Sequence, residues 1–129
     1  RSRGGYGQAI VEMLANGQRI GGINAMMILN FKAAKSYQAR LEQRAGQRTN
    51  NWMVAQANVA ARYRGKGLGK KLYRELFKVL LQKSAGTPVL VGPEKSHLGA
   101  GTTDEALRVW KSLSREYPSA GNLLLLISS

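Results

Sequence analysis

A glycine- and lysine-rich segment in the middle of the chain constrains the fold more than any other feature. Before it, side chains from Trp52 to Val59 alternate in character with a period of two, which is typical of a strand. After it, Leu68 to Gln82 carries leucines four residues apart, which predicts an amphipathic helix. The segment between them includes Arg64–Lys71, where three glycines are interspersed with basic residues. This strand–turn–helix unit indicates a fold that combines a sheet with helices packed on it.

The residues before this unit predict two further strands and a basic connection. Ala9–Leu14 and Gln18–Phe31 read as strands, and Asn16-Gly17 between them is a strong hairpin signal. A bulge is expected at Gly21-Gly22, where two small residues interrupt the alternation. The polar stretch Lys32–Asn51 has only a thin apolar stripe, so we expect an exposed loop or a short surface helix there.

The residues after the unit predict a strand, a helix and a last strand. Val89–Val91 is a short buried strand, and Thr102–Glu105 carries a capping-box pattern that opens a second helix. Asn122–Ile127 is the last strand. The predicted fold class is therefore α+β, with an antiparallel meander followed by β-α-β-α-β on one mixed sheet. The apolar face of the second helix comprises Ala106, Val109, Trp110, Leu113 and Tyr117.

Length and composition limit the class of protein. A chain of 129 residues fits one domain, which we place at residues 8–129 after a flexible basic start at 1–7. The chain has no Cys and one His, His97, so disulfides and cysteine chemistry are excluded and no metal site is expected. No signal peptide or membrane span is evident, and we expect a cytoplasmic location and no membrane partner. The formal net charge of +13 indicates an anionic partner, such as a phosphorylated cofactor, nucleic acid or an acidic protein.

The glycine-rich turn has the physical properties of a phosphate-binding loop. Glycine allows positive φ and close approach of the backbone to an anion. The first N–H groups of the following helix have no intrahelical acceptor, and the helix dipole favours negative charge there. The P-loop and Rossmann patterns counted from Gly65 both require glycine where the sequence has Lys70. A glycine-rich turn with merely solvated charges is the structural alternative.

The stretch Val59–Leu72 resembles the acyl-CoA-binding motif of the GNAT superfamily of N-acetyltransferases. Its pattern, Arg/Gln-x-x-Gly-x-Gly/Ala, is matched by Arg64, Gly67 and Gly69, and Ala61 stands where the family commonly has Pro. The resemblance implies a GNAT-like fold and acetyl-CoA, or another acyl-CoA, as cofactor. It also implies the cofactor-binding residues: Val59 and Ala61 beside the pantetheine arm, Arg64 in the motif, Gly65, Lys66, Gly67, Leu68 and Gly69 beneath the pyrophosphate, and Lys70 adding charge.

The residues expected to move protons depart from the family pattern. GNAT enzymes often use a tyrosine in the last helix as acid, and Trp110 stands at that position. An indole N–H donates a hydrogen bond but is not an acid at neutral pH. Tyr117 is then a substitute acid and Glu12 a candidate base, with His97 as another. Each also has a structural reading: a packing residue at the helix end, an outward strand residue, and an exposed loop residue.

Two functions remain open on the sequence. The first is an N-acyltransferase that moves an acetyl group from acetyl-CoA to an amine. The second is a non-catalytic GNAT-like module, for example part of a phage or virion assembly, that contacts nucleic acid or protein; its location would then be the virion. GNAT domains usually open with a strand and helices, for which Arg1–Gln8 is too short. We therefore expect a fragment of a longer protein, or a reduced form of the fold.

Overall fold

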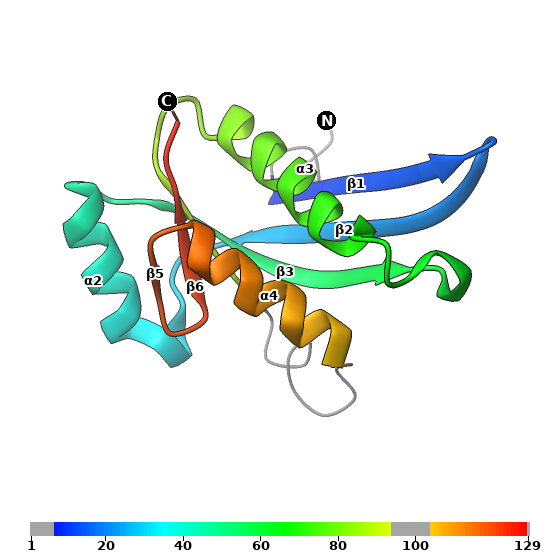
Figure 1. Cartoon of the computed structure of the whole chain (residues 1–129). Coiled ribbons are helices and arrows are strands. Elements are labelled where there is room, and N and C mark those ends of the chain that lie inside the picture. Colours follow the sequence, from blue (N-terminus) through cyan, green and yellow to red (C-terminus); the bar gives the residue numbers. More distant parts are fainter. Residues whose placement is uncertain (1–6, 94–103, 129) are drawn as a thin grey trace.

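The computed structural model describes residues 7–93 and 104–128, and within them six strands form one mixed sheet in the order β1-β2-β3-β4-β6-β5 (Figure 1). All neighbouring strands are antiparallel except β3 and β4, which are parallel. The predicted α+β class and the leading meander are confirmed. The strands are β1 Gln8–Ala15, β2 Gln18–Ile28, β3 Asn50–Val59, β4 Val89–Pro93, β5 Ser119–Ala120 and β6 Leu123–Leu126.

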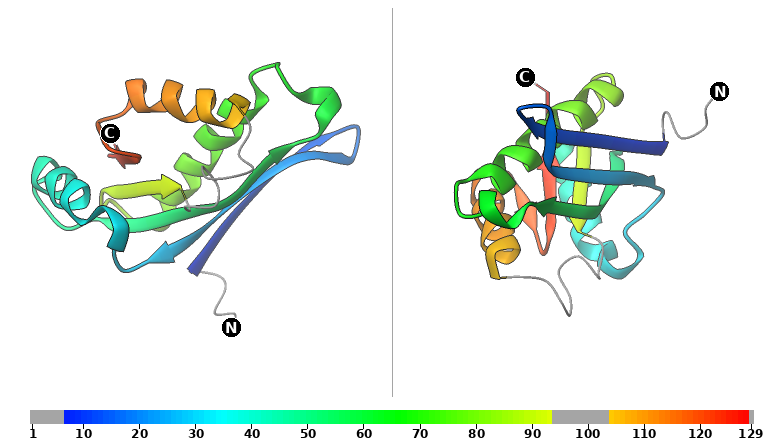
Figure 2. Two further views of the ribbon diagram at one scale, coloured as in Figure 1. Left: turned by 90° about the horizontal axis from the view of Figure 1, so that it is seen from below. Right: turned by 90° about the vertical axis from the view of Figure 1, so that its right-hand side faces the viewer.

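The helices lie on both faces of this sheet. The crossover that a parallel β3–β4 pair requires is supplied by α3, Leu68–Lys83. It packs on the same face as α4, Asp104–Glu116, whereas α2, Lys35–Ala45, lies at one end of the sheet (Figures 1 and 2). Two short 3-10 turns complete the described elements: η1, Lys32–Ala34, leads into α2, and η2, Ala61–Tyr63, follows β3.

The larger core lies between the sheet and the α3–α4 layer. The leucines four apart on α3, Leu72, Leu76 and Leu80, are all buried, as their spacing predicts. They meet Trp52 of β3, which is fully buried, and Leu113 of α4. The predicted amphipathic helix is therefore confirmed, and its apolar face positions the start of α3 at the end of β3.

A second core lies on the opposite face and explains the basic helix. Leu90 of β4 and Leu125 of β6 point away from α3 and are covered by Phe31 and by Leu41 of α2. Of the two alternatives predicted for Lys32–Asn51, an exposed loop or a short surface helix, the structure confirms the helix. A single buried leucine predicts a helix only weakly. The apolar residues that α2 contacts lie on strands that are distant along the sequence.

Two register shifts interrupt the meander, and the predicted bulge is displaced by one residue. Met13 pairs with Gly21 but Leu14 pairs with Arg19, so the extra residue is Ile20 rather than Gly21 or Gly22. A second shift, which the sequence did not predict, lies in β3. Asn24 pairs with Gln56 and Ala25 with Val54, which leaves Ala55 as the extra residue.

Some predictions fall outside the described residues. These are the basic start at residues 1–6, His97, and Thr102 at the opening of the predicted capping box. The helix it was expected to open does begin at Asp104. In the part of the chain that the structure describes, no helix is both long and apolar enough to cross a membrane.

Candidate functional site

The last part of β3 extends beyond its parallel neighbour. The β3–β4 pairing runs from Asn50–Val89 to Val54–Pro93, while β3 continues to Val59. Beyond Val54, this edge of β3 has no β4 partner among the described residues. Backbone N–H and C=O groups on such an edge can pair with an extended ligand, as an added strand would. The extra residue Ala55 lies where β3 and β4 stop pairing, so the bulge marks the start of the open edge of β3.

The chain turns sharply at the end of β3. The Ala60 N–H donates to the Ile20 carbonyl at 2.7 Å, and the 3-10 turn η2 begins at the next residue. Val59 lies on the strand as expected. Ala61, which the resemblance places beside the pantetheine arm together with Val59, lies in the turn rather than on the strand.

The glycine-rich loop has the backbone geometry that an anion site needs. Gly65 and Gly67 have φ of +77° and +78°, in the left-handed region that favours glycine. A β-carbon at either would meet no atom within 4 Å, so the loop is open. Gly67 is the N-cap of α3 and no side chain caps it. The first-turn N–H groups of Leu68, Gly69 and Lys70 therefore face outward from an uncapped helix end.

Gly69 differs from the other two glycines. It lies inside α3, and a β-carbon there would be 3.6 Å from Val109 Cγ2, which is ordinary van der Waals contact. This position therefore needs a small residue between α3 and α4 rather than a left-handed backbone. The difference gives a physical reason for a motif that accepts Gly or Ala at this place.

The basic side chains of the loop have distinct partners. The Arg64 Nε donates to the Val59 carbonyl at 2.8 Å and so closes the loop onto the end of β3. The Arg62 guanidinium and the Lys66 ammonium lie 5.5 and 5.7 Å from the centre of the Tyr63 ring. Arg62 and Lys66 are exposed and lie near the open glycines along the chain.

Lys70 connects the two helices. Its ammonium donates to Ser112 Oγ at 2.7 Å and pairs with Glu116, which also pairs with Arg74. The Lys70 hydrogen bond, followed by the charges of Arg74 and Lys70, lowers the pKa of the Glu116 carboxyl. The Lys70 ammonium, which was expected to bind a phosphate, thus also contacts α4. The sequence did not predict this contact.

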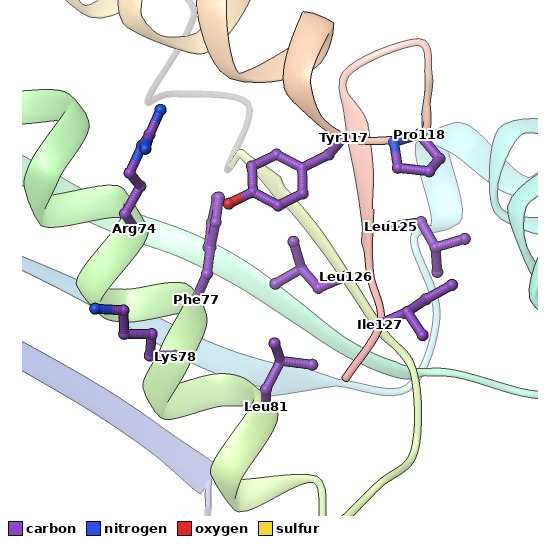
Figure 3. Close-up of a pocket in the computed structure, with 9 residues that line it drawn as sticks. All are labelled: Arg74, Phe77, Lys78, Leu81, Tyr117, Pro118, Leu125, Leu126 and Ile127. Atoms are coloured by element: carbon purple, nitrogen blue, oxygen red, sulfur yellow. The ribbon is translucent and has the colours of Figure 1, made fainter. Parts of the chain in front are cut away.

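Neither predicted proton-transfer residue lies beside the glycine loop. Tyr117 packs edge-on against Phe77, with ring centroids 5.3 Å apart, and Phe77 is ten residues along α3 from the N-cap Gly67. Its ring helps line a cavity of about 380 Å³ (Figure 3). Glu12 is exposed on β1, where its carboxylate accepts from Arg19 Nε at 3.0 Å. It lies on the face opposite α3, because its neighbours in β1 pack into the α3 core.

Trp110 belongs to the core rather than to an open site. It is 4% exposed, and its indole Nε1 donates to the Asn122 carbonyl at 3.1 Å. Its ring meets Tyr73 of α3 in an edge-on contact with centroids 5.4 Å apart. Burial also raises the pKa of the Tyr73 phenol, so this hydroxyl stays protonated.

Comparison with known proteins identifies the family. The model of the acetyltransferase (GNAT) family matches residues 3–100. The chain belongs to the GNAT family of acetyltransferases. A comparison with curated proteins finds no match to this sequence.

Solved acetyltransferase structures share the fold at low sequence identity. An aminoglycoside acetyltransferase from an uncultured soil metagenomic sample has a TM-score of 0.59 at 14% identity, over 89% of this chain and 62% of that protein. A ribosomal-protein-alanine N-acetyltransferase from Brucella melitensis has a TM-score of 0.53 at 10% identity, over 89% and 65%. A putative acetyltransferase from Agrobacterium tumefaciens has 0.55 at 13%, over 89% and 66%. The chain thus spans less than two thirds of the first two proteins.

Proposed function

We propose that this chain binds acyl-CoA and acts as an N-acyltransferase that moves an acetyl group to an amine. One observation carries the proposal. The open glycine loop ends at the uncapped N-terminus of α3, directly after the β3 edge that extends beyond β4. A helix end suited to phosphate and a strand edge that has no β4 partner among the described residues then follow one another along the chain.

The residues of this path fit the cofactor. The cradle is open at Gly65 and Gly67, where an added β-carbon would have no atom within 4 Å, so a pyrophosphate can approach the backbone. We assign the pyrophosphate to the backbone of Gly65–Gly69, with Lys66 and part of the Lys70 charge nearby. We assign the amide-bearing pantetheine arm to the β3 edge between Ala55 and Val59. A bound acetyl-CoA would supply a thioester, from which the acetyl group would pass to the amine nitrogen while CoA would leave as the free thiol.

The chain contributes to this transfer mainly by positioning. Fixing the donor along β3 holds its reactive end at a defined place, which lowers the entropic cost of the reaction. The amine must also arrive unprotonated. Glu12 and Tyr117 remain the proton-transfer candidates suggested by the sequence, and we assign neither a step because neither lies beside the loop.

Isothermal titration with acetyl-CoA tests the proposal. Gly67→Glu places a carboxylate and a strained backbone in the cradle, so we expect at least a tenfold loss of affinity. Gly86→Glu is the matched control, because Gly86 is also left-handed with open space around it but follows the opposite end of α3. It should bind like the wild type. Absent binding by the wild type, or equal affinity of the Gly67→Glu variant, would reject the site.

Turnover separates the enzyme from a non-catalytic module. The core position of Trp110 is the observation that favours the second function. Release of free thiol from acetyl-CoA in the presence of small primary amines supports transfer. Binding of acetyl-CoA without thiol release over background, across aminoglycoside, polyamine and peptide amines, supports a module that binds the cofactor only.

A further inference from the structure

The outward side of α2 and its flanking turns carries a group of cations that the cofactor site does not account for. All five are exposed: Lys32, Lys35, Arg40, Arg44 and Arg48. We call them the α2 basic face. In Figure 1 and in the left view of Figure 2, α2 lies at one end of the molecule and the loop before α3 at the other. A ligand on this face is therefore separate from the cofactor.

Among the side chains that the structure describes, which exclude those of residues 1–6, 94–107 and 129, no ion pair involves the α2 basic face. The ion pairs found there involve Arg19, Lys70, Arg74 and Lys78. The one carboxylate of the helix, Glu42, instead accepts hydrogen bonds from Gln38 and Thr49 at 3.3 Å each. These positive charges are therefore exposed to solvent, where they attract an anion.

The arrangement of the arginines suits a repeating anion. Arg40 and Arg44 are one helical turn apart, or about 6 Å along the axis, and Arg48 follows in the turn after Gly46. Arginine binds phosphate through a planar fork and also stacks on flat rings, which lysine does not do. A row of such groups matches successive phosphates of a nucleic acid strand better than one isolated anion.

An aromatic side chain lies among these cations. Tyr37 is 40% exposed, and the Arg40 guanidinium lies 5.7 Å from its ring centre. The ring packs closely on Gly121 of the β5–β6 turn, where an added β-carbon would come within 2.6 Å of it. A partly exposed ring beside arginines is the combination on which unpaired bases stack while the backbone phosphates contact cations.

We propose that the α2 basic face binds single-stranded nucleic acid, with its arginines on phosphates and Tyr37 beside a base. An acidic protein would satisfy the charge but would leave the aromatic side chain without a role. A duplex would satisfy the phosphate contacts but hides the faces of its bases. The single strand is the partner that uses both features.

Fluorescence anisotropy with a labelled single-stranded oligonucleotide of about 15 nucleotides tests this inference over a salt series. The wild-type affinity should fall as salt rises, with a slope of about −0.7 per phosphate contact. Arg40→Gln/Arg44→Gln should weaken binding and reduce that slope by about 1.4. Arg108→Gln/Lys111→Gln removes the same charge from the exposed side of α4 and should leave both values unchanged.

Two further variants keep the test decisive. Tyr37→Leu retains an apolar contact with Gly121 and should reduce affinity about tenfold without changing the salt slope. Arg48→Gln lies outside the helix and should reduce the slope by about 0.7 even if the double variant does not fold. Acetyl-CoA titration of each variant checks that the rest of the protein is intact.

Four outcomes would overturn the inference. They are no binding of the single strand at low salt, equal losses in the α4 control, equal or tighter binding of a duplex of the same length, and equal competition by polyglutamate at the same charge. The last two would assign the face to double-stranded nucleic acid or to an acidic protein.

Discussion

At the scale of single residues, Gly67 and Gly69 have different structural roles although they look alike in sequence. Gly67 has φ of +78° and is the N-cap residue of α3, whereas Gly69 is an ordinary helical residue, and a β-carbon there would be in contact distance of Val109. A side chain at Gly67 is therefore strained whatever the space around it. A methyl group at Gly69 meets only a normal contact.

We expect opposite effects from one substitution at these two sites. Gly67→Ala should lower the free energy of unfolding by about 1–2 kcal/mol and weaken acetyl-CoA binding. Gly69→Ala should retain binding and add up to about 1 kcal/mol of stability, because alanine is the better helix former. Urea denaturation and calorimetric titration measure both. Similar effects at the two positions would contradict the assigned backbone roles.

At the scale of elements, α2 depends on a single buried apolar side chain. Leu41 is 2% exposed and covers strands β4 and β6 from the face opposite α3. We expect Leu41→Ala to lower the free energy of unfolding by about 2–5 kcal/mol. Leu14→Ala makes the same change on β1 at a side chain that is 62% exposed, and should cost less than about 0.5 kcal/mol. Equal costs in denaturant titrations would mean that α2 does not cover a core.

The contact between α3 and α4 should make the stability of the folded protein depend on pH in the acidic range. The folded state lowers the pKa of Glu116 below its ordinary value of 4.5, so this contribution is present above pH 4.5 and is lost as pH falls through the lowered value. The melting temperature of the wild type should therefore fall more steeply below pH 4.5 than that of Glu116→Gln. Thermal melts from neutral pH to about pH 3 measure the difference.

A control at the same contact keeps the carboxylate. Ser112→Ala removes one partner of the Lys70 ammonium but leaves its pairing with Glu116. It should retain the steep acid response of the wild type. A Glu116→Gln variant with the same acid response as the wild type would show that this contact does not contribute.

At the scale of the whole molecule, two groups of cations that contribute to the net charge of +13 lie at opposite ends. Cations of the loop before α3 lie beside the proposed pyrophosphate site, and those of α2 lie at the far end of the sheet (Figure 1). We expect acetyl-CoA and an oligonucleotide to bind without competing. Titration of acetyl-CoA at saturating oligonucleotide should give an unchanged dissociation constant. A large increase would mean that both ligands use the loop.

Much of the fold followed from local patterns. The alternation in β3, the leucine spacing of α3 and the turn at Asn16-Gly17 predicted elements that the structure contains. Some features left no local signal. The extra residue Ala55 sits in unbroken alternation, and the two-residue strand β5 is too short for a pattern. The role of α2 depends on Leu90 and Leu125, which are far away in the sequence.

The fold class and the glycine loop could be predicted from the sequence alone, because periodicity and glycine spacing are local properties of the chain. The family was indicated by the resemblance of Val59–Leu72 to the acyl-CoA-binding motif. Which of the predicted site residues lie together depends on the three-dimensional packing. In the folded protein, Ala61 lies in a turn, Lys70 pairs with Glu116 and Trp110 is buried. Tyr117 and Glu12 lie away from the loop. These outcomes depend on how α3 and α4 pack side by side on the sheet, and contacts between distant elements are not written in local spacing.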